Sequence, residues 1–162
     1  MNNYLDQVRE VFFINNGEID LLTGSSAPNL FNQLVKRDIQ LAGRNNAQLS
    51  IISLSVCLDR FVLALGQESL RLDLEEALIK TFFELQQIFR DSDCISRVSQ
   101  LGFWVLATGL NEDSSEKMLS RISQSIPTYF DLSICHWQIN QNQLDWYSKI
   151  DELHFKSNLK LD

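Results

Sequence analysis

The segment from Arg97 to Leu106 constrains the fold more than any other part of the chain, because it predicts a β-hairpin. Cys94 to Val98 leads into a short turn, and Phe103 to Leu106 is a run of strand-forming residues that leaves it. Two strands joined by so short a connection must pair antiparallel. The rest of the chain therefore has to supply a sheet that accepts this hairpin.

The longest predicted helix covers residues 69–90 and directly precedes the hairpin. We expect Leu78 and Phe82 to be buried against the sheet, and Glu75 and Glu76 to face solvent. Its apolar and small side chains recur with a period close to 3.6 residues, which is typical of a helix that covers a sheet; they are Leu70, Leu74, Ala77, Leu78, Thr81, Phe82, Leu85, Ile88 and Phe89.

The remaining elements complete a recognisable order of strands and helices. Ser25 or Ser26 is expected to cap the second helix, with Pro28 in its first turn, and Asn111 to Ser115 to cap the helix after the hairpin. Leu49 to Leu58 and Tyr129 to Ile139 are predicted strands. The other predicted helices cover approximately residues 3–13, 28–43, 115–126 and 146–155.

The core order is strand, helix, strand, strand, helix, strand. With right-handed crossovers it predicts an α/β fold, an α+β sandwich whose central, mainly antiparallel sheet has a βαββαβ ferredoxin-like core flanked by helices. We expect the core helices on one sheet face. Residues 1–17 are interpreted as an N-terminal helix and lead-in, and residues 18–162 as one domain.

Composition excludes several classes of function. The net charge of −7 opposes a long-range attraction to nucleic acid or to an anionic membrane. The apolar runs are too short for a membrane span, so a cytoplasmic protein is expected, with further domains possible outside this chain. The cysteines, Cys57, Cys94 and Cys135, match no zinc pattern and are expected to be buried thiols. His136 and His154 belong to no metal motif, and no cofactor is predicted.

Six motifs stand in the order and spacing found in the GGDEF family, the diguanylate cyclases, which the chain resembles over residues 18–157. The match to the family's signature hairpin is framed by a retained arginine and phenylalanine. The motifs are Asp20 to Gly24, Cys57 to Phe61, Arg90 to Arg97, Ser99 to Phe103, Ser133 to Cys135 and Trp146 to Phe155. The resemblance implies the nucleotidyl-cyclase variant of the fold predicted above.

The same alignment implies that the catalytic groups of the family are lost. Cys57 stands where the family has a metal-binding aspartate, and Leu101 and Gly102 stand where it has two acids. A thiol is a poor ligand for Mg²⁺, and leucine is none. The family's lysine and guanine-reading asparagine are Val62 and Leu65, its second guanine contact falls at Asp73 or Leu74, and its two turn glycines are Ser99 and Gln100. A domain without catalytic or metal-binding residues is therefore expected.

One ligand site of the family is retained in the sequence. Arg90 and Asp93 match the inhibitory Arg-x-x-Asp motif, which in the family binds the product, cyclic di-GMP, and Arg121 falls at the place of a second arginine. Arginine forks bind phosphate and guanine acceptors, and aspartate accepts from the guanine amino group. The alternative interpretation is an exposed arginine near a helix C-terminus, followed by a turn aspartate.

Two hypotheses on function follow. In the first, the chain is a regulatory module in cyclic di-GMP signalling that binds this nucleotide through Arg90, Asp93 and Arg121. In the second, it is a nucleotide-independent interaction or dimerisation domain that contacts another signalling domain or protein, or a second copy of itself.

Overall fold

The computed structural model is built around one antiparallel sheet. It describes the backbone of residues 3–159 and the side chains of residues 5–152. Within that part of the chain it has four strands, in the order β2-β3-β1-β4. They are β1 (Leu49–Val56), β2 (Cys94–Ser99), β3 (Gly102–Thr108) and β4 (Phe130–His136). The predicted hairpin and the βαββαβ order are both confirmed, with β1 central between β3 and β4.

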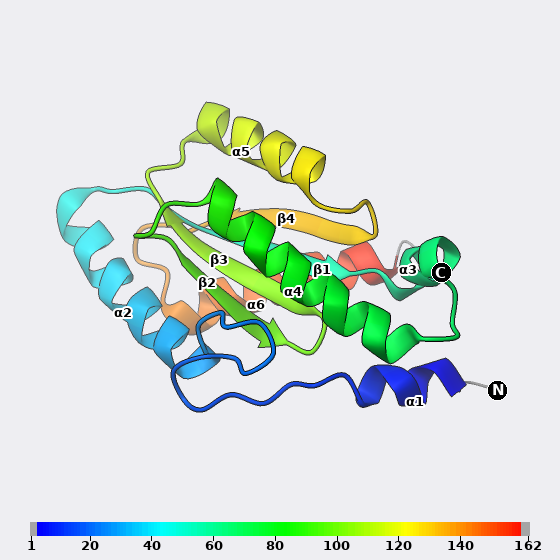
Figure 1. Cartoon of the computed structure of the whole chain (residues 1–162). Coiled ribbons are helices and arrows are strands. Elements are labelled where there is room, and N and C mark those ends of the chain that lie inside the picture. The colour runs from blue at the N-terminus through cyan, green and yellow to red at the C-terminus, as the bar shows by residue number, and fades with distance from the viewer. Residues whose placement is uncertain (1–2, 160–162) are drawn as a thin grey trace.

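Helices cover both faces of the sheet (Figure 1). On one face, α4 (Leu70–Ile88) and α5 (Glu112–Ser125) pack against Ile52 and Leu54 of β1. On the other, α2 (Pro28–Asn45) and α6 (Gln143–Leu159) pack against Leu49 and Ile51. Alternate residues of β1 thus point into two separate cores. The two core helices, α4 and α5, lie on one face as expected, and the opposite face is covered by α2 and α6, which lie outside the βαββαβ order.

The two other helices lie near the N-terminal end of α4. α1 (Asn3–Arg9) contacts α4 and ends before the predicted residue 13. α3 (Leu58–Leu65) follows β1 directly and was not predicted, because its apolar first residues continue the strand pattern without a capping side chain. It stops at Gly66, whose φ of 82° favours glycine.

Of the two predicted helix caps, one was wrong and one is confirmed. The N-cap of α2 is Ala27, without a side-chain cap bond, so the expected cap at Ser25 or Ser26 was wrong, whereas Pro28 does occupy the first turn. α5 begins as predicted at Asn111, whose side chain accepts a hydrogen bond from the backbone N–H of Ser114 at 2.9 Å. Ser114 Oγ in turn accepts from the N–H of Asn111 at 2.8 Å, which completes a capping box.

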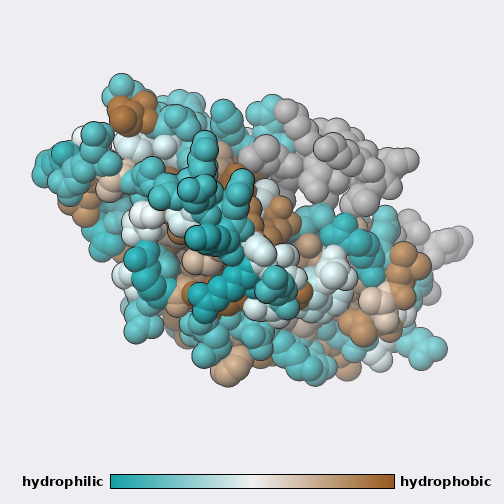
Figure 2. All heavy atoms as spheres, turned by 90° about the horizontal axis from the view of Figure 1, so that it is seen from above, coloured by the Kyte–Doolittle hydropathy of each residue, from teal (hydrophilic) through white to brown (hydrophobic). Residues whose placement is uncertain are grey.

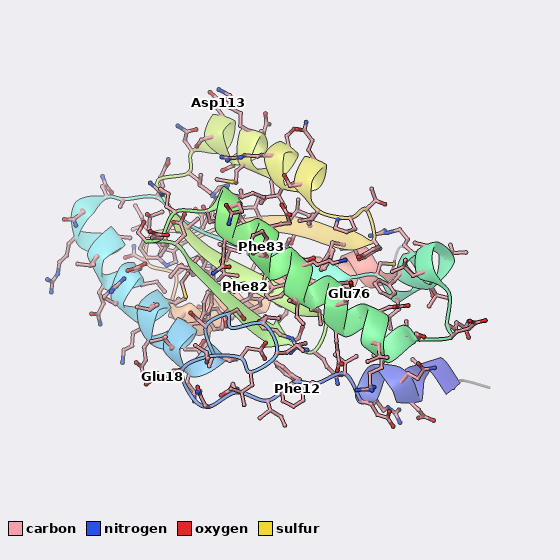
Figure 3. All side chains as sticks on the ribbon, viewed as in Figure 1. Phe12, Glu18, Glu76, Phe82, Phe83 and Asp113 are labelled. Atoms are coloured by element: carbon pink, nitrogen blue, oxygen red, sulfur yellow. The ribbon has the colours of Figure 1, made fainter. Side chains whose placement is uncertain are left out.

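The burial of α4 follows the predicted period on its inner face. Leu78 is fully buried, and Phe82 is partly buried and stacks on Phe103 at 6.4 Å between ring centroids. Glu76 is exposed, as expected (Figure 3). The prediction for Glu75 was wrong: its side chain is only 13% exposed, because it accepts a hydrogen bond from the backbone N–H of Phe12 at 2.9 Å.

Leu78→Ala is expected to lower the free energy of unfolding by about 2–5 kcal/mol, since it removes a fully buried side chain and leaves a cavity. The neighbouring Ile79, 44% exposed, is the matched control, and Ile79→Ala should cost well below 1 kcal/mol. Urea denaturation of both variants measures the difference. Equal losses would mean that α4 packs with a different face.

The surface on the α5 side is largely hydrophilic, with hydrophobic residues in small separate areas (Figure 2). Along α5 the exposed residues include Glu112, Asp113, Glu116, Lys117 and Arg121. Among the described residues, no helix is both long and apolar enough to span a membrane.

Candidate functional site

The hairpin turn lies over the end of β1. Ser99 pairs with Gly102, and Gln100 and Leu101 form the turn between them. The carbonyl oxygen of Leu101 accepts a hydrogen bond from the backbone N–H of Val56 at 3.0 Å. The Leu101 side chain packs against the core shared by β1, α4 and α5. At the position where the resemblance implies an acidic metal ligand, the chain therefore has an apolar side chain that packs against the core.

Gly102 lies too close to β1 to carry a side chain without a shift in structure. A Cβ at this position would be 2.9 Å from the carbonyl oxygen of Leu54 and 2.9 Å from Ser99 Oγ. The hydroxyl could rotate away, whereas the backbone oxygen belongs to the central strand. Glycine at this position thus fits the close approach of two strands.

Gly102→Ala is consequently expected to destabilise the protein by about 1–3 kcal/mol, the usual cost of overpacking. Gly43 is the matched control, because it lies within α2, has no atom within 4 Å of a built Cβ and has no positive φ. Gly43→Ala should stabilise the helix by roughly 0.5–1 kcal/mol. Thermal or chemical denaturation that gives both substitutions the same sign would contradict this description of the hairpin.

The metal-site positions that the resemblance implies at Cys57 and Asp59 lie at the start of α3. Cys57 is buried at the N-cap, and its backbone N–H donates to the Tyr129 carbonyl at 2.7 Å. Asp59 is exposed in the first turn. Arg60 donates to Asp131 Oδ1 at 2.6 Å, and this bond raises the pKa of Arg60. Among residues 5–152, no group of three His, Cys, Asp or Glu side chains could hold a metal ion.

The predicted burial of the cysteines is confirmed. Cys57, Cys94 and Cys135 are buried and free. Burial raises the pKa of Cys94 and of Cys135, so both are neutral thiols at neutral pH. His136 Nδ1 lies 2.7 Å from Ser50 Oγ, and His154 falls outside the described side chains.

A cavity of about 570 Å³ lies beside the Arg-x-x-Asp motif, at the C-terminal end of α4. Arg90 and Asp93 both line it. The Asp93 side chain is 3% exposed, and its Oδ2 accepts from the Arg90 backbone N–H at 3.0 Å and lies 3.5 Å from Arg90 Nε. Arg90 also donates to the Thr108 carbonyl at 2.7 Å. Contacts within the motif and a bond to β3 thus hold Arg90 and Asp93 in place.

Asp93 keeps one acceptor without a partner. Its Oδ1 is buried and has no hydrogen bond to any described residue. A buried unpaired carboxylate oxygen is costly, so native proteins rarely leave one without a reason. This oxygen is thus an acceptor left unused beside the cavity that Asp93 lines.

A second arginine lines the same cavity, and it was not predicted. Arg37 of α2 is 60% exposed and is oriented by Asp38, whose Oδ1 accepts from Arg37 Nε at 3.0 Å. Arg121 lies on the exposed side of α5 and does not belong to the residues that line the cavity. The sequence carried no signal for Arg37, because packing of α2 against β2 brings together residues more than fifty positions apart.

A buried ion pair links the hairpin to the N-terminal segment. Arg97 is fully buried, and its Nη1 lies 3.1 Å from Asp20 Oδ1 and 2.6 Å from the Phe12 carbonyl oxygen. Its Nη2 donates to the Gln100 carbonyl at 2.8 Å. Burial lowers the pKa of Arg97, and the Asp20 carboxylate opposes that shift. Two resemblance motifs, at residues 20 and 97, are therefore in direct contact.

Proteins similar to this chain are found by structure and not by sequence. No protein-family model and no curated protein sequence matches the chain. Its structure is similar to the GGDEF domain of FimX from Pseudomonas aeruginosa, with a TM-score of 0.73 at 11% identity, over 88% of this chain and 94% of that one.

Two further similar structures involve cyclic di-GMP. A microbial GGDEF domain described in an interaction with this nucleotide has a TM-score of 0.71 at 15% identity, over 90% of this chain and 95% of that one. The GGDEF domain of DgcB from Caulobacter crescentus, in complex with cyclic di-GMP, has a TM-score of 0.70 at 10% identity, over 91% and 93% of the two chains. These likenesses concern the fold.

Proposed function

We propose that this chain, which has the fold of GGDEF domains, is a catalytically inactive regulatory domain that binds cyclic di-GMP at Arg90 and Asp93. The observation that carries this proposal is the cavity that both residues line, where Asp93 also keeps one acceptor oxygen without a partner. Its volume lies within the roughly 300–1,000 Å³ common for small-molecule sites. Two of the similar GGDEF structures are described with this nucleotide.

The groups around the cavity match the two kinds of group in the ligand. Arginine binds phosphate oxygens, or the O6 and N7 acceptors of guanine, through two parallel hydrogen bonds. The Asp93 carboxylate can accept from the N–H donors of guanine. Arg37 supplies a second arginine from across the cavity, and Arg121 remains the candidate that the resemblance implies. A local site of this kind can bind an anion despite the net charge of −7.

Calorimetry with cyclic di-GMP and, separately, GTP tests this proposal. We expect saturable heat with cyclic di-GMP and a markedly weaker response to GTP, which has one guanine. Absence of heat with cyclic di-GMP up to about 100 μM, which corresponds to less than roughly 5.5 kcal/mol of binding free energy, would reject it.

Loss of catalysis rests on the identity and packing of three residues. Diguanylate synthesis requires metal ions to neutralise the phosphate charge. Leu101 is partly buried against the core, Gly102 has no room for a side chain, and Cys57 is buried at a helix N-cap. We therefore expect no cyclic di-GMP from GTP with Mg²⁺ or Mn²⁺, measured chromatographically against a boiled control.

Substituting the two hairpin acids back should not restore turnover. In Leu101→Asp with Gly102→Glu, the new Glu would meet the Leu54 carbonyl, and Cys57 and Leu65 would remain. Product above the control, from the wild type or from this double variant, would contradict the proposal of an inactive domain.

A nucleotide-independent interaction domain is the second candidate. Large apolar side chains exposed along α4 favour it, since isolated soluble domains rarely align such residues on one face.

A further inference from the structure

α4 carries an apolar stripe on the face turned away from the sheet. Leu72, Ile79 and Phe83 are 56%, 44% and 60% exposed. Spacings of seven and four residues place them on one side of the helix, which we call the α4 stripe. The opposite side of the helix packs in the core through Leu74 and Leu78. Only Glu75 and Glu76 were predicted to face solvent on this helix, so the stripe is an unpredicted feature.

A charged pair runs along one edge of the α4 stripe. Glu76 Oε1 lies 2.9 Å from Lys80 Nζ, and both side chains are more than half exposed. At 100° per residue, Glu76 and Lys80 both project from the same edge, about one turn apart. Figure 3 labels Glu76 and Phe83 on this helix.

We propose that a second copy of this chain docks on the α4 stripe, with the two α4 helices antiparallel about a two-fold axis near residue 78. In an isologous contact each patch meets its own copy. Antiparallel pairing about residue 78 sets Glu76 of one copy opposite Lys80 of the second copy, and the reverse. The two-fold axis keeps the charged edges of both helices on the same side, so both ion pairs form.

The same register matches the apolar side chains. Leu72 of each copy lies beside Phe83 of the other copy. The two Ile79 side chains meet near the axis. The stripe is therefore complementary to itself in both charge and hydrophobicity, which selects a second copy as the occupant. Figure 1 shows α4 in front of the sheet, with α5 and α1 to its two sides.

This contact is separate from the nucleotide cavity. The residues that line the cavity around Arg90 include Phe82 and Gln86 of α4, but none of the three stripe residues. Dimerisation through α4 therefore requires no nucleotide, and its failure would leave the proposed binding of cyclic di-GMP untouched. One helix pair buries less than the roughly 1,200 Å² of a standard interface, so we expect a Kd on the order of 10–100 μM.

Sedimentation equilibrium of charge-reversal variants, without nucleotide, tests the register. The wild type should rise from the mass of one chain towards twice that mass as concentration passes through this range. Glu76→Lys and Lys80→Glu, each alone, place like charges opposite each other and should remain monomeric. An equimolar mixture of the two variants restores opposite charges in trans and should again reach the mass of a dimer.

Two controls accompany the mixture. Phe83→Ser should weaken self-association at least tenfold, while Lys117→Glu on α5 should associate like the wild type. Circular dichroism checks that every variant is folded; all the substitutions are at exposed positions. A wild type that remains monomeric, single reversals that dimerise like the wild type, or a mixture that remains monomeric would each overturn the proposal.

Discussion

Arg97→Ala is expected to cost about 3–5 kcal/mol of unfolding free energy, because it leaves the buried carboxylate of Asp20 without its cationic partner. The substitution also removes the donors to the carbonyl oxygens of Phe12 and Gln100. It would therefore loosen the hairpin and the N-terminal segment together. Urea denaturation measures the loss.

Arg9→Ala is the matched control, since Arg9 is 79% exposed and pairs with Asp6, itself 73% exposed, one turn away on α1. Exposed pairs of this kind contribute about 0.3–0.5 kcal/mol. If Arg97→Ala fails to fold, the double variant Arg97→Met with Asp20→Leu removes both charges and should recover stability. A loss below about 1 kcal/mol for Arg97→Ala would contradict the buried ion pair.

Arg90→Ala is expected to weaken binding of cyclic di-GMP by roughly ten- to a hundred-fold. A charge-assisted hydrogen bond contributes about 1.5–3 kcal/mol, which converts to this range of Kd. Calorimetry of the variant against the wild type measures the change. The melting temperature should be recorded as well, because Arg90 also donates to the Thr108 carbonyl.

The second arginine can be identified by the same titration. The cavity predicts a loss of affinity in Arg37→Ala, whereas the sequence resemblance predicts one in Arg121→Ala. Arg71→Ala should bind like the wild type. Unchanged affinity in Arg90→Ala would remove the Arg-x-x-Asp motif from the binding site.

Local patterns were sufficient for most of the fold. The hairpin, the helix around Leu78 and the capping box at Asn111 each depend on residues that are neighbours in sequence. The failures arose where tertiary contacts decide. Glu75 is largely buried because a distant backbone N–H reaches it, and α3 forms although Leu58 continues the pattern of the preceding strand.

The candidate site was predictable only in part. Arg90 and Asp93 are three residues apart, so a short motif could identify them, and both do line one cavity. Arg37 comes from a helix on the other face of the sheet, and no local pattern marks it. The contact between Asp20 and Arg97 likewise joins two segments whose proximity depends on the whole fold.

Amide NMR shifts during titration with cyclic di-GMP would show whether the nucleotide binds at Arg90 and Asp93, because they locate the ligand on the fold. We predict saturable shifts at Arg37, at residues 90–94 and at Gly24, which line the cavity, and little change at the hairpin turn, residues 99–102. Shifts centred on the turn, or no shifts at ligand concentrations near 1 mM, which would imply a binding free energy weaker than about 4.1 kcal/mol, would contradict a retained nucleotide site at Arg90 and Asp93.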